Sequence, residues 1–379
     1  MKTNTANAIR CYIPLSSFLE NELNRLASMQ LSNGALPMWP LLPGHSGRIC
    51  PYFSSFAALA LLAGSSRYYE NVRQYIEWHF AHLNTTGTDC NSLDGTIYDY
   101  TIQESDGVLT ETPVYDKNGK PTYDSTDSYA ALFLMVLVQY RHKTGDIGLL
   151  LRHADEIQRV IHAMLGTLDQ DLTYAKPDFP IKYTMDNCEV AAGLASAVRL
   201  SRFIPMLDGQ FLRGTLQRLS QALETCLWNR NQGYYEVGVD HIGAPVTSAF
   251  SWQQFYPDAM AQAFPILMGI QAEDSGRAQY LYRELYENYP PDALSGNMLN
   301  NASMLALTAA RMGDTDTAQK YLDIHQKSFC ETEQPNALTC QGYALGALAA
   351  ATLQSSYEDI AGCNRIYEIT KWKRQESPN

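Results

Sequence analysis

Two kinds of helical segment alternate along this sequence. One kind is apolar and rich in small residues, as in "FSSFAALALLAG" and "CQGYALGALAAATL", and the other is amphipathic and charged, as in "SSRYYENVRQYIEWHF". A helix that is apolar on all sides has to be buried, whereas an amphipathic helix covers a core with one face and meets water with the other. The alternation therefore predicts two layers of helices, with the apolar helices inside.

Helical periodicity predicts about twelve helices. The first spans 15–31, where apolar residues recur at the i, i+3, i+4 spacing that makes one stripe on a helix. The others are expected at about 51–64, 66–83, 125–144, 147–167, 187–204, 209–228, 252–269, 275–289, 298–312, 314–328 and 339–354.

These helices group into six pairs that recur every 50–60 residues or so. Links within a pair are short, as at Gly145-Asp146 and Gly313-Asp314, and links between pairs are long. Six such pairs close naturally into a ring, so the sequence predicts an all-α fold, an (α/α)6 toroid in one domain spanning 1–379. The ring would span about 15–354 and a C-terminal extension 355–379. The alternative is an open helical solenoid.

Three short segments have the character of strands: "GTIYDYTIQ" (95–103), "GVLTETPVYD" (107–116) and "GYYEVGVD" (233–240). The first two are joined by "ESDG", which predicts a β-hairpin. In a ring this small hairpin would lie in the loops at one end.

The long links between pairs should all fall at one end of such a ring. They span 32–50, 84–124, 168–186, 230–251, 290–297 and 329–338 and are rich in Trp, Tyr, Asp and Glu. Loops on a rigid scaffold commonly carry function, so a concave site is expected there. Aromatic faces beside carboxylates suit sugars, whose C–H faces stack while their hydroxyls need polar partners.

Charge and cysteine content limit the classes of binding partner and the cellular compartment to be expected. The net charge is -12, with 28 Lys and Arg against 40 Asp and Glu, which argues against nucleic acid or an anionic membrane as partner and allows neutral ligands such as sugars. The 8 cysteines form no CxxC motif and no zinc-spaced set with histidine. No signal peptide and no apolar run long enough to span a bilayer are evident. A reduced, cytoplasmic chain is expected.

Two acidic clusters stand where inner helices should begin. In "YDSTDSY", Asp124 is a plausible N-cap and Asp127 its capping-box partner, although Asp127 could instead point into the cavity. In "YTMDNCE", Asp186 would be the cap and Glu189 its box partner. Each of these acids therefore has a structural as well as a functional interpretation.

A third cluster, "CETEQPN", precedes the last inner helix and contains Glu331 and Glu333. Asn336 is the better cap there, which leaves Glu333 with the stronger claim to function. Glycoside hydrolysis needs two carboxyl groups across the scissile bond. A toroid would place Asp186 and Glu333 on opposite sides of one pocket, and an inverting mechanism would set their carboxyl groups about 6.5–9.5 Å apart.

The chain resembles the six-hairpin glycosidases with an (α/α)6 barrel, and most of all the glucoamylases and the glucosidase part of glycogen-debranching enzymes. "YDSTDSYAALFLMVLVQYRHKTGD" is similar to the debranching-type pattern Y-x-S-x-D-A…Y…T-G-D. "YTMDNCEVAAGLASAV" stands where glucoamylases carry W-E-E, with Asp186 at the general acid. "TEQPNALTCQGYALGALAA" is similar to the family's A-E-Q…L-T-W-S-Y-A-A-L segment, with Glu333 at the base.

The resemblance implies an inverting, exo-acting glycoside hydrolase of an oligosaccharide or glycoside, without metal or cofactor. Asp186 would protonate the leaving oxygen and Glu333 would activate water. The remaining expected substrate contacts comprise residues that bind hydroxyls (Asp124, Asp127, Tyr123), residues that stack on sugars (Trp39, Tyr52, Trp252), a second acid near the base (Glu331) and a loose match to the family's sugar-holding arginine (Arg48).

The alternative is a non-hydrolytic toroid, either a sugar epimerase or a carbohydrate-binding or scaffold protein. An epimerase needs a base, usually histidine, at the cavity. His45 and His241 are the histidines on loops that could reach it. Zinc-dependent cyclases also use toroids, but no suitable Cys/Cys/His set is present, and Asp89, Asp94 and Asp99 do not match a calcium loop.

Overall fold

The structure is a computed structural model of the chain that describes residues 14–247, 249–294, 298, 301–331 and 338–354. The side chains of 328–331 are not described. The predicted C-terminal extension at 355–379 lies outside the described residues.

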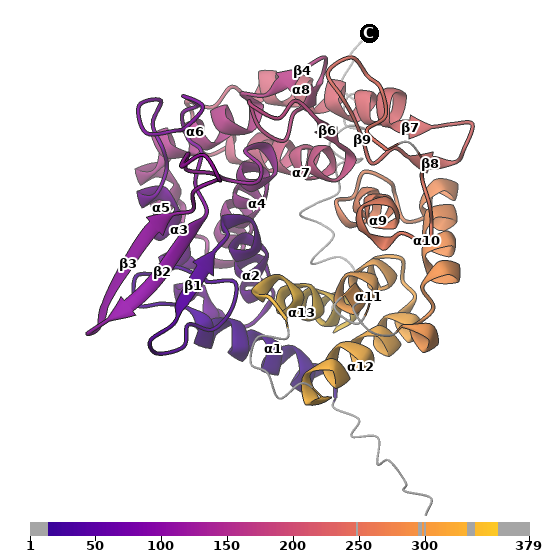
Figure 1. The fold of residues 1–379 in the computed structure, drawn as a ribbon, viewed down its shortest axis with the longest axis horizontal. Coiled ribbons are helices and arrows are strands. Elements are labelled where there is room, and N and C mark those ends of the chain that lie inside the picture. The colour runs from indigo at the N-terminus through magenta and orange to yellow at the C-terminus, as the bar shows by residue number, and fades with distance from the viewer. Residues whose placement is uncertain (1–13, 248, 295–297, 299–300, 332–337, 355–379) are drawn as a thin grey trace, which may run out of the picture.

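The described helices form the predicted closed toroid, with one ring of helices inside another (Figure 1). Each inner helix packs against the next, and the last of them packs against the first, which excludes the open solenoid. The inner ring consists of α2 (Pro51–Ala63), α4 (Asp127–Thr144), α7 (Thr184–Leu200), α9 (Met260–Leu267), α11 (Ala302–Arg311) and α13 (Cys340–Gln354).

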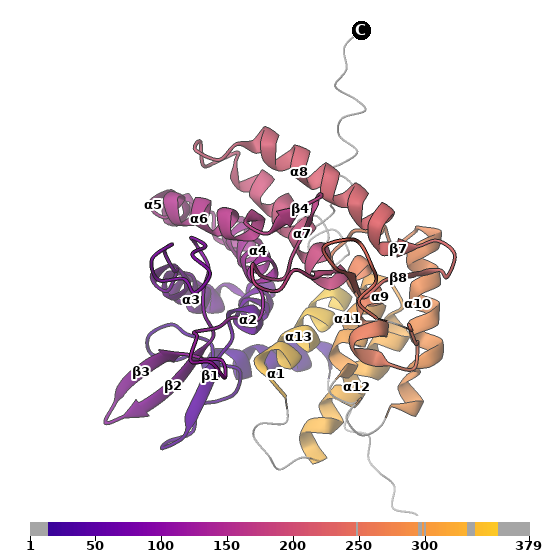
Figure 2. The same ribbon diagram turned by 45° about the horizontal axis from the view of Figure 1, so that its top comes forward.

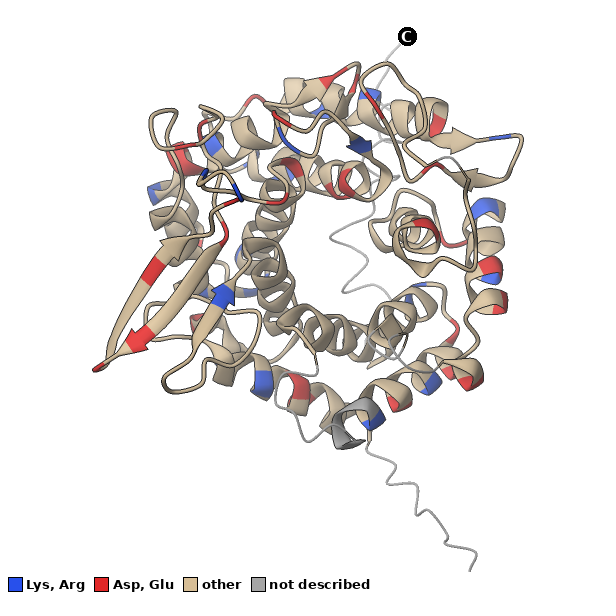
Figure 3. Ribbon diagram, viewed as in Figure 1, with Lys and Arg blue, Asp and Glu red and all other residues tan. Residues whose placement is uncertain are grey.

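The outer ring covers this inner ring on the outside. It consists of α1 (Leu15–Met29), α3 (Tyr69–Ala81), α5 (Ile147–Arg152), α6 (Ala154–Leu165), α8 (Gly209–Ala222), α10 (Gly276–Asn288) and α12 (Thr315–Glu331). Charged residues lie mainly on these outer helices and on the loops, and they are sparse along the inner helices (Figure 3). The distribution follows the predicted division into apolar inner and amphipathic outer helices.

The first and last described helices meet where the ring closes. α13 packs against both α1 and α2, so the last inner helix fills the gap beside the first hairpin. On the outer side of this junction the buried His325 ring of α12 lies 3.3 Å (Nε2 to Oε2) from the buried carboxylate of Glu22 on α1. Contacts between the first and last helices therefore hold the toroid shut.

Some helix bounds differ from prediction for local reasons. The expected helix at 147–167 is divided into α5 and α6 at His153, whose backbone is not helical. The expected helix at 66–83 begins as a 3₁₀ turn, Ser66–Tyr68, before α3. The expected helix at 252–269 is shorter, because a π-helical segment, Phe255–Ala259, precedes α9 and contains the extended Tyr256. A second π-helical segment, Leu223–Leu227, ends α8, and a 3₁₀ turn, Pro291–Ala293, follows α10.

The predicted hairpin is confirmed. β2 (Tyr100–Ser105) and β3 (Val108–Pro113) pair antiparallel, and the turn residues Asp106 and Gly107 have the positive φ angles, 53° and 77°, that a two-residue hairpin turn requires. β1 (Ser46–Ile49), which was not predicted, pairs with β2 and completes a three-stranded sheet at the side of the ring (Figure 2).

The other strands are two residues long and brace the loops in antiparallel pairs. β4 (Leu168–Asp169) pairs with β5 (Leu172–Thr173), β6 (Lys182–Tyr183) with β9 (Gly238–Val239), and β7 (Trp228–Asn229) with β8 (Tyr234–Tyr235). The predicted strand at 233–240 is thus two short strands, β8 and β9.

Replacing Gly193 tests how closely the inner helices pack. A Cβ atom at Gly193 of α7 would lie 2.6 Å from the Cα atom of Ala131 on α4, so the two helices would have to separate. We expect Gly193→Ala to lower the free energy of unfolding by about 1–3 kcal/mol in chemical denaturation. Gly214→Ala is the matched control on outer helix α8, where the nearest atom would be 3.5 Å away. It should stabilise the protein by about 0.5–1 kcal/mol, and equal effects of the two changes would contradict this account.

Candidate active site

A cavity of about 560 Å³ lies at the amino-terminal ends of the inner helices. The links 32–50, 84–124 and 168–186 contribute to its wall, as predicted, whereas no described residue of the link 230–251 is among the lining residues. The lining residues are Met38, Arg48, Cys50, Tyr52, Phe53, Asp99, Thr122, Tyr123, Asp124, Ser125, Ser128, Tyr129, Lys176, Met185, Asp186, Tyr256, Met260, Phe264, Met304 and Gln341.

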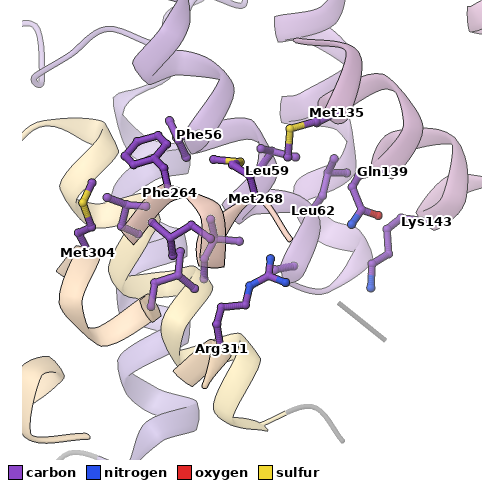
Figure 4. Close-up of a pocket in the computed structure, with 15 residues that line it drawn as sticks. Phe56, Leu59, Leu62, Met135, Gln139, Lys143, Phe264, Met268, Met304 and Arg311 are labelled. Atoms are coloured by element: carbon purple, nitrogen blue, oxygen red, sulfur yellow. The ribbon is translucent and has the colours of Figure 1, made fainter. Parts of the chain in front are cut away.

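A second cavity, of about 100 Å³, lies at the carboxyl-terminal ends of the inner helices (Figure 4). Its described wall is formed by apolar side chains together with Gln139, Lys143 and Arg311, and it includes no carboxylate. Acid–base chemistry with carboxyl groups therefore belongs to the larger cavity. Helix dipoles favour negative charge at that end as well, because the amino-terminal end of a helix carries partial positive charge.

Asp186 lies in the first turn of α7 and faces the larger cavity. The prediction that it caps the helix is wrong, because α7 begins at Thr184 and its N-cap is Tyr183. The neighbouring polar residues are tied to the framework instead. Thr184 donates to the carbonyl oxygen of Glu236, and the Asn187 amide donates to the carbonyl oxygens of Thr173 and Tyr183. Asp186 is left half-buried at the cavity wall.

The surroundings of Asp186 favour its protonated form. Burial raises the pKa of this carboxyl well above its ordinary value of 3.8, and the nearby negative charges of Asp127 and Asp124 raise it further. A raised pKa lets a carboxyl group hold its proton to higher pH, and a held proton can be donated to a reacting oxygen. Asp186 therefore combines a favoured protonated form with access to the cavity.

Glu189 lies one turn further along α7 and is 1% exposed. The prediction that it closes a capping box is wrong: its Oε1 accepts a hydrogen bond of 2.7 Å from the Tyr52 hydroxyl of α2, which is 137 residues away in the chain. Its Oε2 atom is buried and has no hydrogen-bond partner among the described residues. Burial, with the adjacent charge of Asp186, raises the pKa of Glu189 well above 4.5. Sequence spacing gave no sign of this bridge.

Arg48 and Asp99 form an ion pair in the cavity wall. The Arg48 guanidinium donates to Asp99 at 2.6 Å, and the Tyr129 hydroxyl donates to the other carboxylate oxygen at 2.9 Å. Burial raises the pKa of Asp99, and the hydrogen bond from Arg48 opposes that rise. Arg48 was predicted only as a loose match to the arginine that holds the sugar in the family that the sequence resembles. Asp99 was missed as a site residue because its partner depends on the pairing of β1 with β2, and β1 was not predicted.

Asp124 and Asp127 have different environments. Asp124 is exposed and lines the cavity, and the prediction that it caps α4 is wrong, since the N-cap is Thr126. Asp127 is fully buried outside the cavity lining, where it accepts hydrogen bonds of 2.6 Å from Ser125 and from Thr173. Burial raises the pKa of Asp127 to about 6. These contacts give Asp127 a structural role beneath the cavity.

Of the aromatic residues predicted to contact the substrate, some line the cavity and others do not. Tyr52 and Tyr123 line the cavity, but the Tyr123 hydroxyl is held by Asn91 and Asp89. Trp39 and Trp252 are not among the lining residues. The aromatic rings that the sequence did not single out are Phe53, Tyr129, Tyr256 and Phe264.

Several predictions cannot be placed in the cavity. Glu333 lies outside the described residues, and Glu331 is the last residue of α12 with an undescribed side chain. The capping prediction for Asn336 also falls outside them. His45 and His241 are exposed and are not among the residues that line the cavity.

Three further observations concern the described residues alone. They contain no group of three or more His, Cys, Asp or Glu side chains that could hold a metal ion. Five of their cysteines are free thiols, Cys50, Cys90, Cys188, Cys226 and Cys340. Within the same residues, every helix is too short or too polar to cross a membrane.

Glu189→Gln tests the electrostatics beneath the cavity. A group whose pKa is raised by folding loses stability as pH rises, from the unfolded pKa up to the folded one. The ordinary pKa of a glutamate is 4.5, and above that pH the wild type should lose about 1.4 kcal/mol of unfolding free energy per pH unit relative to the variant, until the pKa of Glu189 in the folded protein is reached. Denaturation between pH 4 and pH 8 measures this, with the exposed Glu104→Gln as control. A difference that stays constant with pH would contradict the prediction.

Several solved structures with a similar fold are named as glycosidases. A glycosidase variant in complex with glucose has a TM-score of 0.62 and 12% identity, over 89% of this chain and 96% of that one. A rhamnosidase from Klebsiella oxytoca with rhamnose bound has a TM-score of 0.58 and 15% identity, over 88% and 63%. An inactive α-1,6-mannanase variant from Salegentibacter sp. in complex with α-1,6-mannotriose has a TM-score of 0.55 and 10% identity, over 89% and 98%. No family model and no curated protein matches the sequence. The shared feature is the helical-barrel fold.

Proposed function

We propose that this protein is a glycoside hydrolase and that Asp186 is its general acid. The observation that carries the proposal is a carboxyl group whose protonated form is favoured by its surroundings and which faces a cavity of about 560 Å³. Aromatic rings and an arginine–carboxylate pair share that cavity, and such groups bind sugar rings and hydroxyls.

The proposed reaction is a single inverting displacement. Asp186 gives its proton to the glycosidic oxygen as the bond between that oxygen and the anomeric carbon breaks. Water adds to the opposite face of that carbon, and its proton passes to a second carboxylate. We assign that base to Glu333 on the strength of its motif.

Binding of the sugar is proposed for the remaining wall. Arg48 and Asp99 neutralise each other, so together they present hydrogen-bonding groups with no net charge. Tyr256, which is 68% exposed, offers a ring face at the cavity for stacking. These features fit a neutral sugar, and the neighbours described above contain glucose, rhamnose and mannotriose.

The alternative remains a non-hydrolytic toroid, in the form of a sugar epimerase or a carbohydrate-binding or scaffold protein. An epimerase would need a base such as histidine at the cavity. The cavity wall, as far as the described residues define it, contains no histidine. This favours carboxylate chemistry over that of an epimerase. An activity assay distinguishes a carbohydrate-binding protein from an enzyme.

Asp186→Asn should reduce kcat by about 10²–10⁴-fold on whichever substrate the wild type hydrolyses, because the amide cannot act as an acid. The measurement is a hydrolysis screen against oligosaccharides and aryl glycosides. Glu333→Gln should cause a comparable loss, and NMR of the first product should show the inverted anomer.

Asp106→Asn, in the turn of the hairpin, is the control for the change in net charge, and it should be fully active. Turnover that survives both Asp186→Asn and Glu333→Gln would refute the site assignment. Absence of turnover by the wild type on every substrate would favour the binding protein.

The pH dependence of hydrolysis should report the charge of Asp124. Since Asp186 must be protonated to act, kcat/KM should fall as pH rises through its pKa. Asp124→Asn removes a negative charge that raises that pKa, so the basic limb should move to lower pH. An unmoved limb would contradict the prediction, and a collapse of kcat instead would assign Asp124 to the chemistry.

A further inference from the structure

One face of the three-stranded sheet is polar along its two cross-strand rows nearest the larger cavity, and beyond them, beside the hairpin turn, it carries the exposed Val108. In its register Arg48 pairs with Thr101 and Thr101 with Thr112, while Ser46 pairs with Gln103 and Gln103 with Thr110. Paired residues point to the same face, and so do residues two apart along a strand. We call these residues the polar sheet face: Ser46, Arg48, Thr101, Gln103, Thr110 and Thr112.

The opposite face of the sheet packs against the toroid. Ile49 and Ile102 are fully buried, and Glu111 accepts hydrogen bonds from Trp78 and His82 of the outer helix region. This packing fixes the sheet on the ring and directs the polar sheet face to the outside. The orientation of the polar sheet face therefore follows from the packing of the opposite face against the toroid. Replacing the threonines should leave that orientation unchanged.

The polar sheet face is continuous with the larger cavity. Arg48 belongs to both, and Asp99, its partner in the cavity wall, directly precedes β2. Beyond Arg48 the surface is hollowed, with Thr101, Gln103, Thr110 and Thr112 on the strands and Pro113, Val114 and Tyr115 at its end. Backbone hydrogen bonds from Val114 to Asp99 and from Thr122 to Val114 join that hollow to the cavity wall.

The chemistry of this surface matches a neutral sugar chain. Threonine hydroxyls and the Gln103 amide both donate and accept hydrogen bonds, as sugar hydroxyls do. None of the described residues that line the hollow is charged, and Tyr115, which is 53% exposed, offers a ring at its edge. Strand geometry makes the polar sheet face about 10 Å wide across three strands and about 7 Å long between its two rows, which is room for more than one sugar ring.

We propose that the polar sheet face and Tyr115 bind the remainder of a neutral oligosaccharide whose terminal sugar occupies the cavity. The proposal rests on the proposed function and adds to it a substrate class, since it makes a chain of several sugars the preferred ligand over a disaccharide.

The test compares ligands of increasing length in a protein that binds without turnover. Calorimetric titration of Asp186→Asn uses maltose, maltotriose and maltohexaose, and in parallel the α-1,6-linked mannobiose, mannotriose and mannohexaose. Affinity should rise with chain length in at least one series. Adding Thr101→Val and Thr112→Val together removes two hydroxyls at little change of shape and with good strand propensity. This should weaken binding of the hexasaccharide about tenfold and leave the disaccharide unchanged.

Two further variants sharpen the result. Tyr115→Ala should also weaken the hexasaccharide selectively, by loss of a stacking surface. Thr225→Val, at an exposed position in the π-helical segment Leu223–Leu227, makes the same chemical change away from the sheet and should have no effect. Unchanged thermal unfolding of each variant shows that the fold is intact.

The outcomes separate the two proposals. Binding that increases with length but is unaffected by Thr101→Val with Thr112→Val, and by Tyr115→Ala, overturns the sheet proposal and leaves the proposed function standing. Equal affinity for disaccharide and hexasaccharide does the same. Failure to bind any member of either series overturns the sheet proposal, and the proposed function falls with it only if the wild type also hydrolyses nothing in the screen described above.

Discussion

Close packing of the inner helices is the constraint on which the rest of the structure depends. At Gly193 the backbone of α7 approaches Ala131 of α4 so closely that even a methyl group would not fit without movement. Small residues along the inner ring allow the helices to pack tightly as a barrel. The barrel in turn brings together the amino-terminal ends of helices that are far apart in sequence, and those ends and their preceding links form the larger cavity.

Much of the fold could be predicted because its signals are local and repeated. Alternation of apolar and amphipathic segments specified the two rings, and the turn Asp106-Gly107 specified the hairpin. The exceptions required long-range contacts. β1 is four residues long and has no pattern of its own, and it is a strand only because β2 lies beside it. The division of α5 from α6 depends on the backbone of His153, which periodicity does not show.

The candidate site was less predictable, because the sequence identifies acids but not their environments. Asp127 and Asp186 both stand in first turns of inner helices, yet one is buried in hydrogen bonds and the other faces the cavity. The difference is set by Thr173, on a separate strand, which holds Asp127 and Asn187 together. Likewise the Arg48–Asp99 contact requires the pairing of β1 with β2, and the Tyr52–Glu189 contact joins α2 to α7 across 137 residues, so neither can be read from local spacing.

The closure of the ring also has a kinetic consequence. α1 and α2 make their final contacts with α13, and Glu22 meets His325 at a separation of 303 residues. Contacts between such distant segments form slowly, because a long chain must lose entropy before they are gained. During synthesis the first hairpin must therefore wait, with one apolar side uncovered, until nearly the whole chain has left the ribosome. The interval before closure is the period in which the chain is most exposed to aggregation.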